Sequence, residues 1–279
     1  MRTQALDRVA DARTGTASSN AGFACRNVNA SYTGGHGGAP IFEGIDFDVA
    51  PGEFVSILGG SGVGKTTLLR VLGGLHAAGK GSDVRFAGQP LSGAPDRVVM
   101  VFQNYAASLL PWRTVESNVR LGLEGKMPRR EQRERALAAL TMVGLADNLH
   151  YHPRQLSGGM QQRVQIARAL VMDPLALLMD EPFGALDAIT KATLQDALLR
   201  IQRQTGMTVV FVTHDLDEAI YLSDRIIVLA GSPAGVARDL AVDLPRERDQ
   251  VATKADPRYL ELRQEIYTVM HSSDPRRRP

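Results

Sequence analysis

One glycine-rich stretch has the residue types and the spacing that bind phosphate. Residues 59–66 read Gly-Gly-Ser-Gly-Val-Gly-Lys-Thr, which fits the pattern G-x-x-x-x-G-K-T. The stretch follows the apolar run Phe54–Leu58 and opens a predicted helix over Lys65–Leu72. Glycines let successive backbone N–H groups point inward around phosphate oxygens, and a helix N-terminus adds partial positive charge. We expect Lys65 to pair with the β- and γ-phosphates of a nucleotide and the Thr66 hydroxyl to ligate Mg²⁺.

Polar side chains follow three further apolar runs, at the point where each run ends. Short continuous apolar runs are typical of strands buried on both faces of a parallel sheet. Ligands of open α/β sheets bind beyond the carboxyl ends of such strands. The sequence therefore predicts an NTP-hydrolysing site, with an amide, two carboxylates and an imidazole along one crevice. The runs are Val98–Phe102, Leu175–Met179 and Val209–Val212, and the polar residues after them are Gln103, Asp180 with Glu181, and Thr213 with His214.

The two adjacent acids suit different tasks. A hard cation beside phosphates takes oxygen ligands, usually through water, and Asp180 suits that role. Glu181 suits general-base or water-positioning work on the attacking nucleophile. Adjacent acids after a strand also occur in ordinary surface turns, and the phosphate loop upstream is what favours the magnesium interpretation.

A second candidate anion site precedes another helical stretch. Ser157, Gly158 and Gly159 stand at the start of a helix predicted over Gly158–Leu170, where free N–H groups and a hydroxyl would face outward. An ordinary N-cap explains the same residues, because Ser and Gly often begin helices for local reasons.

The order of the predicted elements indicates an α/β P-loop NTPase fold with a mainly parallel core sheet. The segment Phe23–Val49 reads as antiparallel strands beside the nucleotide site, with Gly34-Gly35 and Gly37-Gly38 in a turn. A helical block from Ala106 to Leu170 interrupts the alternation and predicts a subdomain inserted into the sheet domain. Its helix Arg129–Val143 is expected to present Leu137, Leu140 and Val143 as an apolar stripe. The remaining predicted elements are a short strand near Val84–Phe86, a helix Asp187–Thr205, a strand Arg225–Leu229, a β-ribbon Val236–Leu244 and a helix Pro257–His271.

Composition narrows the class of protein. The formal net charge is +2, which is too small to suggest nucleic-acid binding by bulk electrostatics. The only cysteine is Cys25, so a disulfide framework and a thiolate metal cluster are excluded. Residues 1–22 are polar without an apolar core, which favours a loose extension over a secretory signal. No apolar run approaches the length of a membrane span, so other subunits would have to provide one.

In their order, these stretches make the chain resemble the ATP-binding subunit of an ATP-binding cassette (ABC) transporter. The resemblance covers about Phe23 to Leu244. Met160 stands where glutamine is frequent and the loop 76–97 matches poorly, but neither touches an expected catalytic group. The matching stretches are Gly59–Thr66 (Walker A), Gln103 (Q-loop), Leu156–Gln161 (signature), Leu175–Glu181 (Walker B), Ala185-Leu186-Asp187 (D-loop) and His214 (switch histidine).

The resemblance implies roles that the residues alone leave open. Tyr32 would stack on adenine, and the less favoured alternative is a strand tyrosine with a solvated hydroxyl. Gln103 would ligate Mg²⁺ and sense the γ-phosphate, and His214 would hold the attacking water. The expected catalytic residues are Glu181, His214, Lys65 and Gln103; the expected metal ligands are Thr66, Gln103 and Asp180; the expected nucleotide-binding residues are Tyr32, Gly59, Gly60, Ser61, Gly62, Val63, Gly64, Lys65, Thr66, Thr67, Ser157, Gly158, Gly159 and Asp187.

The resemblance also implies an assembly. The expected domains are an extension at 1–22, an ABC ATPase domain at 23–245 with a helical subdomain at about 106–170, and a C-terminal helix and tail at 246–279. Two copies would pair head to tail, with Ser157 serving the partner's ATP. We expect permease subunits as membrane partners, a periplasmic solute-binding protein as an indirect one, and a place on the cytoplasmic face of the cell membrane. Trp112 belongs either to the core or to a groove that receives the permease.

Three stretches resemble the nitrate, sulfonate and taurine importers within the family. They are Leu109–Val115, Pro182–Asp187 and Leu262–Tyr267. The competing interpretations are a soluble cassette ATPase of DNA repair or translation, a non-hydrolytic module and an exporter cassette. Soluble cassettes usually fuse two cassettes or carry long coiled coils, and exporters often fuse the membrane span. An intact set of Lys65, Asp180, Glu181 and His214 argues against a non-hydrolytic module.

Overall fold

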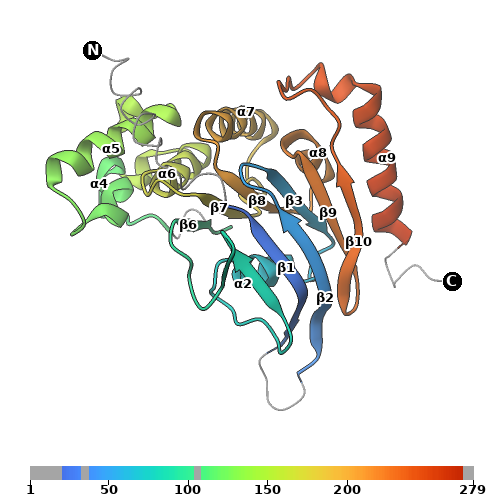
Figure 1. Cartoon of the computed structure of the whole chain (residues 1–279). Helices are drawn as coiled ribbons and strands as arrows, with labels where there is room; N and C mark the ends of the chain where they lie inside the picture. The colour runs from blue at the N-terminus through green and yellow to red at the C-terminus, as the bar shows by residue number, and fades with distance from the viewer. Residues whose placement is uncertain (1–20, 33–37, 104–107, 273–279) are drawn as a thin grey trace.

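A ten-stranded sheet with helices on both faces forms the centre of the molecule (Figure 1). The computed structural model describes residues 21–32, 38–103 and 108–272. The strands lie in the order β5-β4-β1-β2-β10-β9-β3-β8-β7-β6. The neighbours from β9 to β6 are parallel to one another, and the strands on the other side pair mostly antiparallel. This arrangement confirms the predicted fold class.

The parallel part of the sheet is built from the apolar runs that the sequence singles out. All residues of β3, β7 and β8 are buried, as expected for strands covered on both faces. The run predicted to reach Phe102 is shorter, because β6 ends at Val101 and the Phe102 side chain is 43% exposed. The bounds are β3 Phe54–Gly59, β6 Val98–Val101, β7 Ala176–Asp180, β8 Thr208–Thr213 and β9 Arg225–Gly231.

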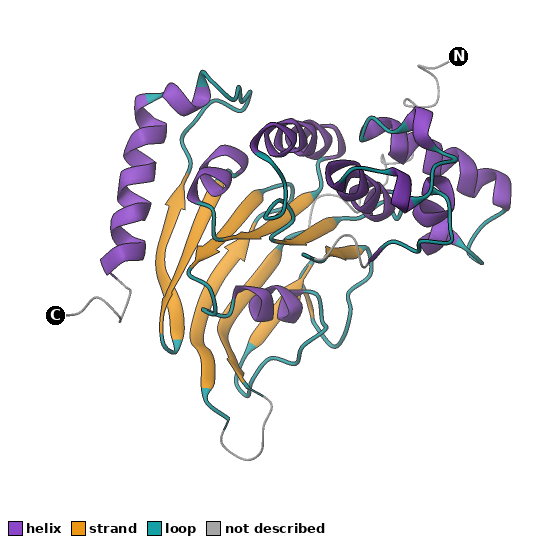
Figure 2. Ribbon diagram, turned by 180° about the vertical axis from the view of Figure 1, so that it is seen from behind, coloured by secondary structure: helices purple, strands orange, loops and turns teal. Residues whose placement is uncertain are grey.

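Alternate residues of these strands enter two separate hydrophobic cores, one on each face of the sheet. In β7, Leu177 and Met179 join the core beneath the helices α5 to α9, whereas Ala176 and Leu178 join the core around α2. Successive side chains of a strand point to opposite faces, which explains the division. Figure 2 shows the single helix α2 on one face and the larger group of helices on the other.

The antiparallel strands extend the sheet beyond β9. β10 pairs with β9 and reaches β2 through one parallel bridge, Ala234 with Phe42. The predicted ribbon at Val236–Leu244 is therefore present but begins and ends earlier. Of the predicted glycine turn, Gly34, Gly35 and Gly37 lie outside the described residues. The bounds are β1 Phe23–Ser31, β2 Pro40–Val49, β4 Asp83–Phe86, β5 Gln89–Pro90 and β10 Ala234–Ala241.

A helical region stands between β6 and β7 in the chain and lies beyond the β6 edge of the sheet (Figure 1). The predicted apolar stripe on α5 is partly wrong, because Leu137 is 44% exposed while Leu140 and Val143 are buried. The buried face centres on Ala136 and Ala139, and Leu137 is turned about 100° from Ala136 around the helix. The bounds are α4 Val115–Arg120, η2 Leu121–Leu123, α5 Arg129–Met142, η3 Ala146–Asn148, η4 Pro153–Gln155 and α6 Gly158–Leu170.

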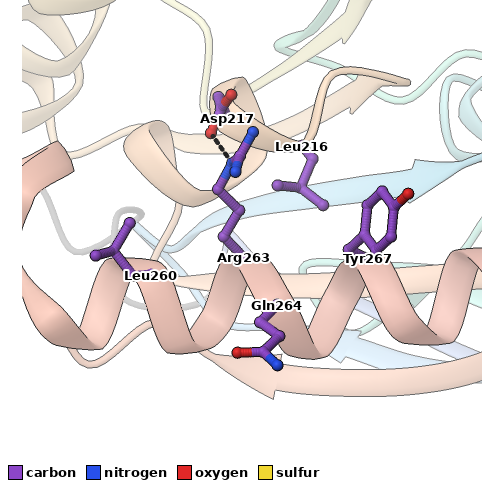
Figure 3. A pocket seen from close by; sticks show the side chains of 6 residues that line it. All are labelled: Leu216, Asp217, Leu260, Arg263, Gln264 and Tyr267. Atoms are coloured by element: carbon purple, nitrogen blue, oxygen red, sulfur yellow. Dashed lines mark hydrogen bonds and ion pairs between the residues drawn. The ribbon is translucent and has the colours of Figure 1, made fainter.

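The remaining helices cover the sheet and its C-terminal side. Arg263 and Tyr259 of α9 both bond the carboxylate of Asp217 on α8, and Leu216 and Leu260 help to line a groove of about 460 Å³ between the two helices (Figure 3). Within the ranges described, no helix is long and apolar enough to cross a membrane. The bounds are α2 Lys65–Leu72, α7 Ala188–Thr205, α8 Leu216–Leu222, η5 Thr253–Ala255 and α9 Pro257–Ser272.

Candidate active site

The predicted phosphate loop leaves the carboxyl end of β3 and turns directly into α2. Gly62 and Gly64 have φ angles of +81° and +100°, which favour glycine. A Cβ at Gly64 would lie 2.6 Å from the Ile41 side chain, so the loop also passes close to β2. Gly60 and Ser61 are exposed at the tip of the loop. The conformation thus leaves the loop open toward solvent at the N-terminus of α2.

Lys65 lies folded back over the loop that precedes it. Its side chain is 5% exposed, and its Nζ donates to the carbonyls of Gly59 at 2.9 Å and Gly60 at 3.0 Å. Its Nζ also lies 3.7 Å from Glu181 Oε1. Burial lowers the pKa of Lys65, and the neighbouring Glu181 offsets part of that effect. An anion bound on the loop would add a second counter-charge to this buried ammonium, beside Glu181.

Thr66 and Asp180 form a pair of oxygen donors beside the loop. Thr66 Oγ1 donates to Asp180 Oδ1 at 2.9 Å, and Asp180 is 5% exposed. Burial raises the pKa of Asp180, although the hydrogen bond from Thr66 opposes this. In the described ranges, no group of three or more His, Cys, Asp or Glu could hold a metal ion. The donor set fits Mg²⁺, which takes few protein oxygens and completes its shell with phosphates and water.

Glu181 is the point at which the predicted catalytic residues meet. Its Oε2 accepts from Gln103 Nε2 at 3.3 Å and lies 3.0 Å from His214 Nδ1. Together with Lys65 on Oε1, three polar side chains from three other segments reach this one carboxylate. Glu181 itself has φ +43°, a conformation that is uncommon for a residue other than glycine and that often marks functional sites.

The register of the parallel strands explains why these residues converge. Met179 pairs with Val101, and Asp180 pairs with Val212 on the next strand. On the far side of β8, Thr213 pairs with Leu58, the residue before the phosphate loop begins. The four strands therefore end at one edge of the sheet, which is where a crevice for ligands forms in such folds.

The second predicted anion site is arranged differently. Ser157 is exposed and caps α6, since its Oγ accepts from the Met160 N–H at 3.3 Å. A Cβ on Gly159 would lie 2.3 Å from Thr190 Cγ2, so the start of α6 packs directly on the first turn of α7. Asp187 caps α7 by accepting from the Thr190 N–H at 3.0 Å. The N-cap interpretation of Ser157 is therefore correct locally. The exposed Ser157 and the glycines after it, Gly158 and Gly159, are called the serine–glycine corner below, and the Ser157 side chain is accessible for other contacts.

The remaining predicted site residues differ in how exposed their side chains are. Val63 and Thr67 are half-buried, Val63 in the loop and Thr67 in α2. Tyr32 is 62% exposed just after β1, so its ring is accessible to a ligand and its hydroxyl to water. Trp112 is 72% exposed, which excludes the core interpretation of this residue. Asn104 to Ala107, the first part of the predicted permease groove, lie outside the described residues.

Sequence reasoning missed a charged cluster beside His214. Asp215 caps α8 by accepting from the N–H groups of Asp217 and Glu218, and Lys191 bonds Asp215 from α7. The signal was available, because an Asp followed three residues later by a Glu is a helix-start pattern. It predicts α8, but no sequence pattern places Lys191 against it.

Comparison with known proteins identifies the family of this chain. The family model described as ABC transporter matches residues 42–184. Relatives include the nitrate import ATP-binding protein NrtD of Synechococcus elongatus, 44% identical, covering 82% of this chain and 84% of that protein. The bicarbonate transport protein CmpD of the same organism is 43% identical and covers 85% and 86%. The aliphatic sulfonates import protein SsuB 1 of Xanthomonas axonopodis is 43% identical and covers 83% and 91%.

The relatives differ in length, and a solved structure shares the fold. The chain covers 34% of NrtC, a longer nitrate import ATP-binding protein of Synechococcus elongatus. The dimeric structure of MJ0796, a bacterial ABC transporter cassette, matches with a TM-score of 0.69 and 34% identity, covering 80% of this chain and all of that one. MJ0796 is also known in a post-hydrolysis state with ADP and Pi.

Proposed function

The chain belongs to the ABC transporter family and is an ATP-binding ATPase, and on that premise we propose that it energises the import of a small anion through separate membrane subunits. The observation that carries the proposal is the convergence of Lys65, Gln103 and His214 on Glu181 at the carboxyl edge of the sheet. These are the groups that phosphoryl transfer to water needs, namely a phosphate cradle, a general base and a residue to orient the nucleophile.

Each residue has a distinct task in the proposed reaction. The N–H groups of the phosphate loop and Lys65 bind the β- and γ-phosphates, and Lys65 leaves the Gly59 and Gly60 carbonyls to do so. Glu181 takes the proton of the attacking water, and His214 orients that water and contacts the γ-phosphate. Tyr32 stacks on the base of the nucleotide.

Mg²⁺ is the proposed metal, held by Thr66, Asp180 and Gln103 and by the phosphates of ATP. When bound, it neutralises charge that develops on the phosphate oxygens. The hydrogen bond between Thr66 and Asp180 keeps the two oxygen ligands together in its absence.

We propose that two copies pair head to tail for turnover. Ser157, Gly158 and Gly159 form a helix N-terminus that carries no acidic or basic side chain of its own, with Ser157 exposed, Gly158 half-buried and Gly159 buried. Such a corner can complete a phosphate site that another chain brings to it, because N–H groups and a hydroxyl stabilise an anion. Asp187, which caps the adjacent helix α7, lies within the same surface.

Besides the second copy, the proposed partners are permease subunits, which this chain would meet at the inner face of the cell membrane. A solute-binding protein would deliver the solute to these subunits. Trp112 is the most exposed aromatic side chain of the described residues and follows the segment after Gln103. An exposed aromatic side chain of this kind can bind a helix of a partner subunit in a groove. When Gln103 contacts the γ-phosphate, the segment after it, which includes Trp112, would shift.

The proposed solute is a small molecule with an oxyanion group of the nitrate, sulfonate or bicarbonate type. These are the solutes in the names of NrtD, SsuB 1 and CmpD, and taurine is included because it carries a sulfonate group beside its ammonium. Uptake of labelled nitrate, bicarbonate and an alkyl sulfonate by cells with and without the gene tests the choice. Equal uptake of all three anions by both strains would refute it.

The Glu181→Gln variant tests the catalytic proposal. The amide keeps the shape of the side chain but cannot accept a proton, so ATP binding should be retained while turnover falls roughly a hundredfold or more. Glu261→Gln, an acid on α9 far along the chain, is the matched control and should leave turnover unchanged. Normal hydrolysis by Glu181→Gln would refute the base assignment.

A further inference from the structure

A charged cluster lies between the first turn of α7 and the start of α8. Lys191 Nζ lies 3.0 Å from Asp215 Oδ2 and 2.9 Å from Glu218 Oε1. Glu218 is 3% exposed and the Lys191 side chain 25% exposed. Burial opposes the charge on Lys191, but its hydrogen bonds to Glu218 and Asp215 outweigh burial and raise its pKa. Buried charges destabilise the fold unless they are paired, so we expect these ion pairs to stay formed. They link the first turn of α7 to the start of α8.

One end of this link holds the backbone on both sides of His214. Thr213 Oγ1 donates to Glu218 Oε2 at 2.7 Å and accepts from the Asp215 N–H at 2.9 Å. Asp215 also caps α8 through its other oxygen, Oδ1. The His214 side chain is 54% exposed, so packing around the ring does little to fix it. The position of the imidazole therefore depends on its contact with Glu181 and on the bonded residues before and after it.

The other end of the link belongs to the turn that begins at Asp187. The Lys191 N–H donates to the Asp187 carbonyl at 2.9 Å, which closes the first turn of α7. Thr190, inside that turn, packs against Gly159 so closely that a Cβ there would lie 2.3 Å away. The turn is thus in direct contact with the serine–glycine corner of α6.

The geometry points to Lys191 as a positioning residue that ties the turn Asp187–Lys191 to the segment Thr213–Asp215 and so holds His214 at Glu181. The inference rests on the proposed function, because it concerns the rate at which ATP is hydrolysed. Lys191 touches neither the phosphate loop nor the Thr66–Asp180 pair. Its loss should therefore lower kcat and leave ATP binding nearly unchanged. Any residue that keeps the positive charge at this distance should preserve the link.

The test compares Lys191→Met combined with Glu218→Gln against Lys191→Arg. The double variant removes the charges of Lys191 and Glu218, so the deeply buried carboxylate is not left unpaired. Asp215 keeps its charge, but it is 34% exposed and still accepts from two backbone N–H groups, so the fold is retained, which a melting curve checks. We expect kcat of the double variant to fall roughly tenfold or more through misplacement of His214. Its KM for ATP should stay within about twofold of wild type, because the residues that bind ATP in both the ground state and the transition state are unchanged. Lys191→Arg should keep kcat close to that of wild type.

Arg263→Met is the matched control, because it removes a different ion pair of α8. Arg263 bonds Asp217 from α9 at 3.0 Å (Figure 3). Its kcat should remain that of wild type. A wild-type kcat in the folded double variant overturns the inference, as does an equal loss in Lys191→Arg or in Arg263→Met. If wild-type protein itself fails to hydrolyse ATP, the proposed function fails instead, and the two results are distinguishable.

Discussion

Two helix N-termini of this chain carry glycines and a hydroxyl suited to phosphate, yet their surroundings differ. At the start of α2, the side chains of Lys65 and Thr66 bond Gly59, Gly60 and Asp180 from the same chain. At the start of α6, the Ser157 hydroxyl bonds only the helix that it caps. The first terminus has an acid, an amide and an imidazole within reach. The second has an exposed corner.

The two termini would supply different halves of one nucleotide site. In the proposed function, the α2 terminus holds the groups that do chemistry and would bind a nucleotide alone. The α6 terminus offers backbone N–H groups without a catalytic side chain, so it would act only on an anion that another molecule presents. The close packing of Gly159 on Thr190 fixes that corner in space. Changes at the two termini should therefore separate binding from turnover.

Lys65→Ala should have the largest effect on the α2 side. Removing the buried ammonium takes away the charge that pairs with the β- and γ-phosphates, so ATP affinity and turnover should both fall, turnover roughly a hundredfold or more. Isothermal titration with ATP and a phosphate-release assay measure the two effects. Lys80→Ala, at an exposed lysine, is the control. Unchanged ATP binding by Lys65→Ala would break the comparison.

Ser157→Ala should affect turnover while sparing ATP binding by a single chain. Loss of the cap should lower the free energy of unfolding by about 1 kcal/mol. Thr114→Ala removes another N-cap, which serves only α4, and should cost the same stability. We expect turnover to fall roughly tenfold for Ser157→Ala alone, because a hydroxyl to the γ-phosphate is lost. Equal turnover in the two variants would mean that Ser157 is a cap and nothing more.

Tyr32→Ala sharpens the description of the α2 side with a smaller effect. If the ring stacks on adenine, its removal should raise the KM for ATP roughly two- to tenfold with kcat unchanged. Tyr151→Ala removes another exposed tyrosine, in the helical region, and should leave KM unchanged. An unchanged KM in Tyr32→Ala would support the solvated-hydroxyl interpretation instead.

Cys25 should show no reaction with thiol reagents in the folded protein. It is fully buried in β1, and burial raises the pKa of its thiol to about 12. At pH 8 the thiolate fraction is then about one in ten thousand. Labelling with a maleimide should occur only after unfolding in denaturant, which mass spectrometry detects. Rapid labelling of the native protein would contradict this packing.

Much of the α2 side could be predicted from the sequence, because its signals are local. The apolar runs predict the strands, and the glycine loop and the polar residues mark where each strand ends. The parallel register then brings these ends together on one side of the sheet. The helix bounds Lys65–Leu72 and Gly158–Leu170 agree with prediction for the same reason. The family resemblance supplied the roles of Gln103 and His214, which residue types alone did not.

Other features depend on tertiary contacts that no local pattern carries. The exposure of Leu137 follows from how α5 packs, since Ala136 and Ala139 occupy the buried face instead. The bond of Lys191 to Asp215 joins two helices that begin after different strands. The left-handed backbone of Glu181 stands where its N–H donates to the Val212 carbonyl of the next strand, and its residue type does not predict it.

The claim on which the account depends is that ATP lies between the phosphate loop of one copy and the serine–glycine corner of another. A cysteine at Ser61 and a second at Ser157 place reactive thiols at both, in a chain whose own Cys25 is buried. The measurement uses these changes in the Glu181→Gln background with a short bis-maleimide cross-linker. A cross-linked band at twice the 30.2 kDa of one chain is expected when ATP and Mg²⁺ are present. No such band is expected without nucleotide or when a chain carries only one of the two cysteines. An equally strong band without ATP, or the absence of a band with ATP bound, would show that ATP does not lie between the two copies.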